Sequence, residues 1–274
     1  MTIPRAEALL PQLTRFVHLL LEEIQQGQIT DWPDFIEQVR AFYTPERMAQ
    51  IEHVVPGWDE MASYANQQTL IHVTSVLVAL YRLPEYQQAT SDQRALMEWV
   101  VLFHDVAKIA QRGRHDYTHG FRSAAIAGKA LRAIGFPVTA DYAAQIDDWF
   151  ALTHSASIHR ADLGEDAQDN TKLPQIVAGI DRLFGVDAPA GWVIKAVLFH
   201  ISVVTDPDYP TVAPLTDAEF RRYLTPSSFP ILRMMMLVDT DAWNIFDAPE
   251  SQRQRQQTLD AFERLAPLLS GVSG

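Results

Sequence analysis

The stretch VVLFHDVAKIAQRGRHDYTH, residues 100–119, interrupts an apolar run with an adjacent histidine and aspartate. The apolar residues before His104 recur at helical spacing, so the stretch predicts a helix that carries an imidazole beside a carboxylate. Burying these two groups is costly unless a partner compensates them. The pair therefore raises the question of which other residues of the chain it interacts with.

Helical periodicity continues through nearly every long segment, and convincing alternating strand patterns are absent. We therefore expect an all-α fold, a multi-helix bundle with long loops. The polar residues 155–172 and the Pro-, Thr-, Ser- and Asp-rich residues 205–230 are expected to be loops, the second around a short helix. The expected helices are 5–27, 31–43, 45–54, 67–83, 92–109, 121–134, 140–153, 173–184, 192–203, 217–223, 231–244 and 251–269.

The composition narrows the function classes. With 47% hydrophobic and 20% charged residues in 274, the chain is typical of a soluble globular protein, and it contains neither a membrane-span pattern nor a signal-peptide pattern. It has no cysteine, which excludes disulfides and thiolate metal sites. These features predict a cytoplasmic protein. The net charge of −12 argues against extended nucleic-acid binding.

Four of the nine histidines lie inside apolar helical runs. They are His72, His104, His154 and His200. A single such residue is usually a satisfied core histidine, but four of them suggest a shared divalent cation, because one ion satisfies several imidazoles at once. Histidine and carboxylate ligands without cysteine suit Fe, Mn, Zn, Co or Ni, and Mg²⁺ remains a candidate. We expect one or two such ions.

The order of these histidines along the chain, with an aspartate directly after His104, resembles the HD-domain superfamily of metal-dependent phosphohydrolases over about residues 65 to 245. The family is all-helical and is named for its His-Asp doublet. The matching positions are His72 in QTLIHVTSVLVAL, His104, Asp105 and Lys108 in HDVAK, His119 and Ser123 in THGFRSAAIAGKAL, His154, and Asp239 or Asp241 in LVDTDAW. The resemblance implies an N-terminal helical extension (1–64), a metal-binding domain (65–250) and a C-terminal helix (251–274).

The resemblance also implies site residues. His72, His104, Asp105 and Asp239 are the expected core ligands, with His119, His154, His200 or Asp241 as further candidates. Two outer assignments stay open: His119 with His154, or His154 with His200 while His119 only lines the pocket. Asp105, Lys108 and His119 are the expected catalytic residues, and Lys108, Arg112, Arg114 and Arg122 the expected phosphate contacts.

The implied activity is hydrolysis of a small phosphorylated molecule, such as a nucleotide, by a metal-activated water. The doublet is followed by Val106 and Ala107 instead of the glutamate-aspartate pair of the stringent-response hydrolases, and the glycine-tyrosine-proline signature of cyclic-di-GMP hydrolases is absent. Two alternatives remain: a di-iron oxygenase acting on a small polar substrate, and a non-catalytic helical module with a structural metal. The sequence allows an oligomer without predicting one.

Two smaller expectations complete the set. The second His-Asp dipeptide, His115 and Asp116, lies in a polar loop and is expected to be a surface pair. Helical spacing predicts core positions for Tyr64, Trp149, Phe150 and Trp243, with a ligand pocket as the competing interpretation.

Overall fold

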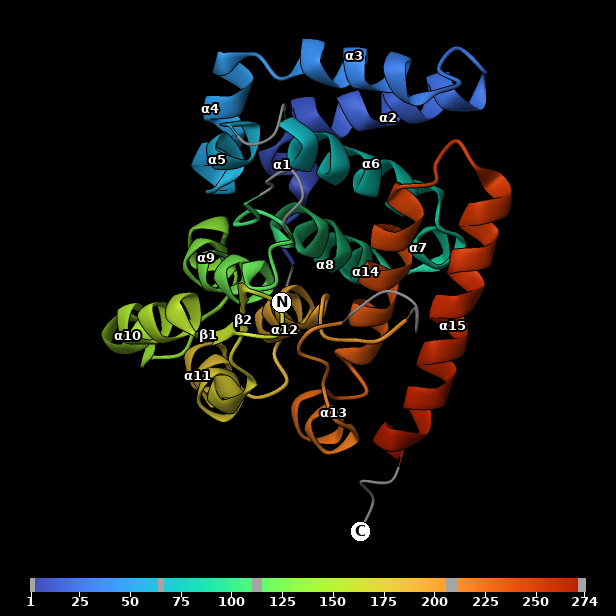
Figure 1. The fold of residues 1–274 in the computed structure, drawn as a ribbon. Helices are drawn as coiled ribbons and strands as arrows, with labels where there is room; N and C mark the ends of the chain where they lie inside the picture. Colours follow the sequence, from blue (N-terminus) through green and yellow to red (C-terminus); the bar gives the residue numbers. More distant parts are fainter. Residues whose placement is uncertain (1–2, 64–66, 110–114, 206–210, 271–274) are drawn as a thin grey trace.

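The computed structural model describes residues 3–63, 67–109, 115–205 and 211–270. Within these ranges the regular secondary structure is helical apart from one two-stranded hairpin, which confirms the predicted all-α class (Figure 1). No helix among these residues combines the length and the apolar character that a bilayer crossing requires.

Five helices precede helix α6 (Gln68–Arg82) in the described residues; the second, third and fifth of them pack directly against it, and the second and third lie in blue at the top of Figure 1. The five helices are α1 (Ala6–Leu9), α2 (Pro11–Gln25), α3 (Trp32–Phe42), α4 (Pro45–Val54) and α5 (Trp58–Ser63). The single helix expected over 5–27 was wrong. The chain breaks at Leu10 (φ −128°, ψ 54°) because Pro11 has no amide hydrogen and disfavours a helical conformation in the residue before it.

Four helices form the centre of the molecule. Helix α14 (Phe229–Ala242) packs against α6, α8 (Ser91–Phe103) and α12 (Pro189–Phe199). Every residue of α6 from Thr69 to Tyr81 is buried, so this helix is surrounded on all sides. Thr90 and Gln93 form a reciprocal capping box that fixes the start of α8.

The remaining elements surround this centre. They are α7 (Pro84–Gln88), α9 (His119–Ile134), α10 (Tyr142–Ser155), the 3-10 turn Asn170–Lys172, α11 (Leu173–Phe184), α13 (Asp217–Tyr223) and α15 (Ala248–Ser270). Helix α9 ends at Gly135, which has the left-handed φ of 109° that glycine adopts without cost. Asp31 caps α3 by accepting a hydrogen bond from the amide of Asp34.

Residues 155–172 are not the irregular loop that was expected. They contain strands β1 (Ser157–Arg160) and β2 (Glu165–Gln168), which pair antiparallel from Ser157–Gln168 to Arg160–Glu165. Three of the four β1 residues are exposed, so the strand carries no apolar alternation for a sequence pattern to detect. Gly164, at φ 66°, supplies the left-handed residue before β2.

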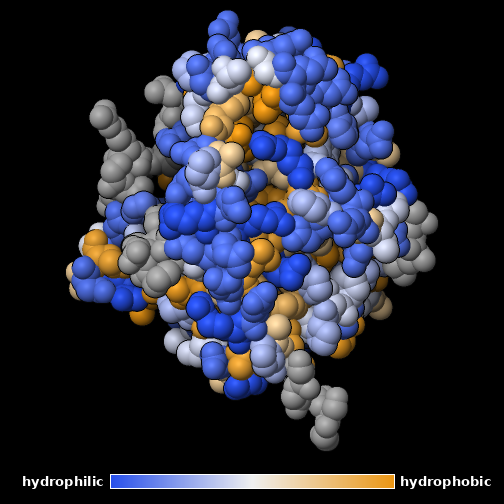
Figure 2. Space-filling view, turned by 90° about the vertical axis from the view of Figure 1, so that its right-hand side faces the viewer, coloured by the Kyte–Doolittle hydropathy of each residue, from blue (hydrophilic) through white to orange (hydrophobic). Residues whose placement is uncertain are grey.

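One hydrophobic core includes residues from all three expected parts of the chain, from Ile3 through the central helices to Phe262. The C-terminal helix α15 packs along α14 and α13 and forms one edge of the molecule (Figure 1). The face on this side is mainly hydrophilic, with smaller apolar areas between the polar side chains (Figure 2).

Candidate metal centre

Six side chains that could hold a metal ion meet between the central helices. They form two groups, and within each group one donor atom per residue lies within 4.8 Å of the others. The groups are His72, His104 and Asp239, and Asp105, His119 and His200. All are buried except Asp239, which is half-buried.

His104 and His200 are positioned by the same local device. Each follows the letters VLF and is the residue at which its helix, α8 or α12, ends. Each ring donates Nδ1–H to the carbonyl three residues earlier, Val101 at 2.7 Å and Val197 at 2.6 Å. Because a carbonyl only accepts, Nδ1 carries the hydrogen and Nε2 keeps its lone pair. The expected helices 92–109 and 192–203 were therefore too long, because the chain turns at the histidines.

Nε2 of His119 and Nε2 of His200 face each other. His119 also directs Nδ1 to a carbonyl, that of Asp116, so both Nε2 atoms are acceptors, and they lie 3.0 Å apart. Two lone pairs at this distance repel unless a cation or a proton satisfies both. Burial lowers the pKa of His119, which disfavours the proton. The pair is therefore suited to a metal cation.

Asp105 belongs to the second group and also turns toward the first. Its Oδ1 is 3.1 Å from Nε2 of His119 and 3.5 Å from Nε2 of His200. Its Oδ2 is 3.7 Å from Nε2 of His72 and 3.6 Å from Nε2 of His104. One carboxylate thus turns an oxygen to each group, which is the arrangement a ligand shared by two ions requires.

The charges at the site match those that metal ligands need. Burial lowers the pKa of His104 to about 4, so its imidazole is neutral at neutral pH. Burial opposes ionisation of Asp105, but Lys108, His104 and His119 together hold the pKa of its carboxyl well below the usual range. Burial likewise opposes ionisation of Asp239, and the hydrogen bond and charge of His72 outweigh it and lower the pKa.

Unsatisfied polar atoms show that these residues fit a cation. Among the described residues, Nε2 of His104, Oδ1 of Asp105 and Nδ1 of His72 are buried without a hydrogen-bond partner. Two of these are lone pairs directed toward the other ligands, and leaving a buried acceptor unpaired costs about 1–3 kcal/mol. His72 fits with one adjustment: its Nε2 is now hydrogen-bonded to Oδ1 of Asp239 at 2.8 Å and would have to release its hydrogen to bind an ion.

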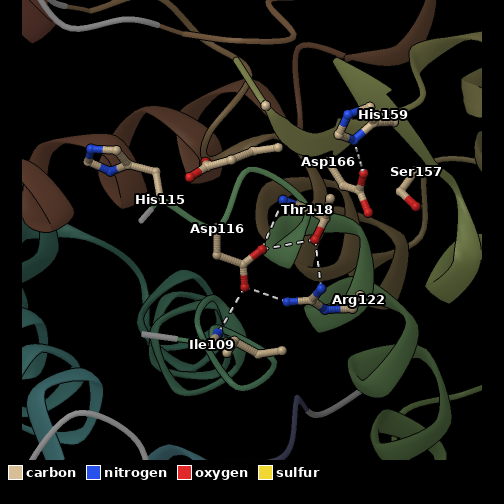
Figure 3. A pocket seen from close by; sticks show the side chains of 10 residues that line it. Ile109, His115, Asp116, Thr118, Arg122, Ser157, His159 and Asp166 are labelled. Atoms are coloured by element: carbon tan, nitrogen blue, oxygen red, sulfur yellow. Dashed lines mark hydrogen bonds and ion pairs between the residues drawn. The ribbon is translucent and has the colours of Figure 1, made fainter. Parts of the chain in front are cut away.

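The expected phosphate contacts lie in different places. Lys108 lines the cavity beside the cluster, and its ammonium is 2.7 Å from Oδ2 of Asp105. Arg122 lines a neighbouring cavity of about 410 Å³, where it pairs with Asp116 and donates to Oγ1 of Thr118 (Figure 3). Arg112 and Arg114 lie outside the described residues.

Asp116 is not the surface residue that was expected. Its carboxylate is 9% exposed and accepts hydrogen bonds from the amides of Ile109 and Thr118 and from Arg122 (Figure 3). It thereby joins the two ends of the segment between the His-Asp doublet and α9, and so supports the position of His119. His115 is exposed, as expected for a surface residue.

Two candidate ligands are not part of the cluster. His154 is exposed near the end of α10 and stacks on Phe150, with ring centroids 5.3 Å apart. Both open assignments of the outer ligands included His154, so neither describes the cluster, which instead brings His119 and His200 together. Asp241 accepts a hydrogen bond from Ser251 of α15, whereas Asp239 is turned toward His72.

A cavity of about 440 Å³ opens beside the ligands. Trp243 lines it, is 48% exposed, and stacks on His72 with ring centroids 4.5 Å apart. The core prediction for Trp243 was therefore wrong, whereas Trp149 is buried as predicted and Tyr64 lies outside the described residues. The sequence also gave no sign that polar residues of α15 line this cavity, because only the packing of α15 on α14 brings them there.

Comparison with known proteins adds no relative: no family model, no curated protein and no solved structure matches the chain.

Proposed function

We propose that this protein is a metal-dependent phosphohydrolase of the HD-domain type that cleaves a phosphate ester or anhydride of a small molecule. The observation that carries the proposal is the position of Asp105, which turns one oxygen toward His119 and the other toward His72 and His104. A divalent ion bound by such a ligand set polarises a phosphoryl oxygen and lowers the pKa of bound water.

The other residues support this chemistry through their charge and position. Lys108 is 29% exposed at the cavity wall, and its ammonium can donate to a phosphoryl oxygen as well as to Asp105. The neutral imidazoles of His104 and His119 keep their Nε2 lone pairs for ligation. Imidazole and carboxylate donors without sulfur suit Fe, Mn, Zn, Co or Ni.

A second candidate, an iron-dependent oxygenase of the same superfamily, is favoured by the balance of the ligand set. Four imidazoles and two carboxylates form the two groups, so nitrogen donors predominate. Imidazole suits iron, and a nitrogen-rich set is as compatible with an iron centre as with a hydrolytic one. The substrate of such an enzyme would be a small polar molecule.

The test is phosphate release from a panel of phosphomonoesters, nucleotides and pyrophosphate compounds, with protein stripped of metal and reloaded with Mn²⁺, Fe²⁺, Zn²⁺, Co²⁺, Ni²⁺ or Mg²⁺ in turn. We expect Asp105→Asn to lower the rate at least about a hundredfold, because it removes the shared carboxylate. Asp241→Asn is the matched control, since Asp241 is a nearby carboxylate directed at Ser251, and it should retain the rate.

Helical circular dichroism spectra should confirm that both variants fold. A panel that releases no phosphate with any metal, together with oxygen consumption by the iron-loaded protein, would reject the hydrolase in favour of the second candidate.

A further inference from the structure

The cavity beside the ligands has a second wall of different chemistry. It is formed by the end of α14, the residues that follow it and α15, and apart from the candidate ligand Asp239 the polar side chains that these described residues contribute are uncharged. They are Thr240, Trp243, Asn244, Gln254, Gln257 and Thr258. This wall would therefore contact an uncharged part of a ligand whose charged part lies at the metal ligands and Lys108.

Trp243 supplies a flat surface in this wall. Its indole stacks on the imidazole of His72 with an interplanar angle of 12°, and the residue is 48% exposed. His72 covers one face of the indole, so a ligand ring can extend the stack on the other face. Aromatic pairs of this kind contribute about 0.5–1.5 kcal/mol beyond the area they bury.

The side-chain amides of Asn244 and Gln254 are hydrogen-bonded to each other. The carboxylate of Glu250 accepts from Nε2 of Gln254 at 2.6 Å, which turns Oε1 of Gln254 toward Asn244. Asn244 donates Nδ2 to that oxygen at 2.7 Å. Because a carboxylate only accepts, this chain fixes both amide orientations. Asn244 and Gln254 therefore form a rigid part of the wall.

Gln257 and Thr258 are not committed in this way. Thr258 is 1% exposed, lines the cavity, and among the described residues its Oγ1 has no hydrogen-bond partner. Gln257 is half-buried at the same wall, and its carboxamide has no partner within the described part of the chain either. A buried hydroxyl without a partner is costly, so it points to a group that arrives with the ligand.

We infer that α15 is a recognition wall of this site, and that it binds an uncharged, flat heterocycle of the substrate. The heterocycle stacks on Trp243, and its edge exchanges hydrogen bonds with Gln257 and Thr258. A carboxamide offers a donor and an acceptor side by side, which matches the edge of a nitrogen heterocycle. The inference deepens the proposed function by naming part of its substrate, but the ring contacts themselves require no hydrolysis.

The test measures binding of phosphate-free rings. Adenosine, guanosine, cytidine and uridine are titrated into Mn²⁺-loaded protein by calorimetry, with glucose 6-phosphate as the probe without an aromatic ring. At least one nucleoside should bind. Gln257→Leu and Thr258→Val should each weaken it by about three- to tenfold, the loss expected for one hydrogen bond.

Gln252→Leu is the matched control, because Gln252 is an exposed residue of the same helix that does not line the cavity. It should bind the nucleoside as the unmodified chain does. Trp243→Leu should also weaken binding, and its metal content is measured alongside because Trp243 packs on His72.

The outcomes separate this inference from the proposed function. Failure of all four nucleosides to bind, or binding that Gln257→Leu and Gln252→Leu affect equally, would overturn the recognition wall, even if phosphate is released from glucose 6-phosphate. Nucleoside binding that depends on Gln257, without phosphate release from any compound of the panel, would uphold the wall and reject the hydrolase.

Discussion

At the scale of single residues, the burial of His104 ties the stability of the fold to pH. The folded protein lowers the pKa of this imidazole to about 4, from an ordinary value of 6.5. Between these values the unfolded chain binds a proton that the folded chain excludes, so stability increases with pH. Burial lowers the pKa of His119 too, which acts in the same direction.

We therefore predict that metal-free protein loses free energy of unfolding as the pH falls from 7 to 5, by about 2 kcal/mol from His104 alone. Urea unfolding at both pH values, in the presence of a chelator, measures this. His104→Gln should remove the part of the difference that comes from His104. Equal stability of the unmodified protein at pH 7 and pH 5 would contradict the burial of a neutral imidazole.

The facing nitrogens of His119 and His200 give a second prediction at this scale. In His200→Gln a carboxamide N–H can donate to Nε2 of His119, which replaces a repulsive contact by a hydrogen bond. Metal affinity should fall at least about tenfold, whereas the metal-free protein should lose no more than about 1 kcal/mol. Metal titration and chemical unfolding measure the two quantities. His154→Gln is the control, and an affinity loss there would contradict the position of His154 outside the cluster.

The sequence predicted the candidate metal ligands better than it predicted which of them lie together in the cluster. His72, the His104–Asp105 doublet and Asp239 follow from the ordered motifs, and they lie together. His154 matched the same pattern, but its position near the end of α10 leaves it exposed. The sequence alone does not show which way the end of a helix points. The packing was therefore needed to decide that His200 joins the cluster and His154 does not.

At the scale of elements, apolar periodicity predicted most helices and misplaced several ends. Ends set by a local signal, such as Gly135 after α9, were correct. Ends set by tertiary hydrogen bonding, such as those at His104 and His200, were not. The β1–β2 hairpin was missed because its residues are mostly exposed and carry no apolar alternation.

Helix α11 offers a prediction in which packing outweighs helix propensity. Gly179 lies against Trp149, and a Cβ at this position would be 2.1 Å from Cδ1 of the indole. Gly→Ala inside a helix ordinarily stabilises by about 1 kcal/mol. Here Gly179→Ala should instead destabilise by about 1–3 kcal/mol, because Trp149 is held by a hydrogen bond to the Ile176 carbonyl at 2.9 Å.

Gly191→Ala in α12 provides the comparison, because its added methyl meets only Ile180, at 3.4 Å. Thermal unfolding should show a clear loss of stability for Gly179→Ala and no such loss for Gly191→Ala. Stabilisation by Gly179→Ala would mean that α10 and α11 are not packed around Trp149 as described.

At the scale of the whole molecule, the candidate ligands join helices that are far apart in the sequence. The cluster connects α6, the ends of α8 and α12, the start of α9, and α14, from His72 to Asp239. An ion held by these residues binds the folded chain and not the unfolded one, so it must stabilise the entire fold.

We accordingly predict that Mn²⁺ at about one hundred times its dissociation constant adds about 2.7 kcal/mol to the free energy of unfolding, which is a rise of roughly 5 °C in the melting temperature. Calorimetry with and without a chelator measures the shift. Asp105→Asn should reduce it and Asp241→Asn should retain it. A melting temperature that metal leaves unchanged would show that no metal bound at the cluster stabilises the fold.

The most direct test of the central claim is the metal content per chain after loading with Mn²⁺ and desalting. The geometry of Asp105 between two ligand groups predicts one or two ions per chain in the unmodified protein and in Asp241→Asn, and fewer in Asp105→Asn. A chain that retains no ion, or an Asp105→Asn variant that retains as many as the unmodified protein, would contradict the proposed metal centre.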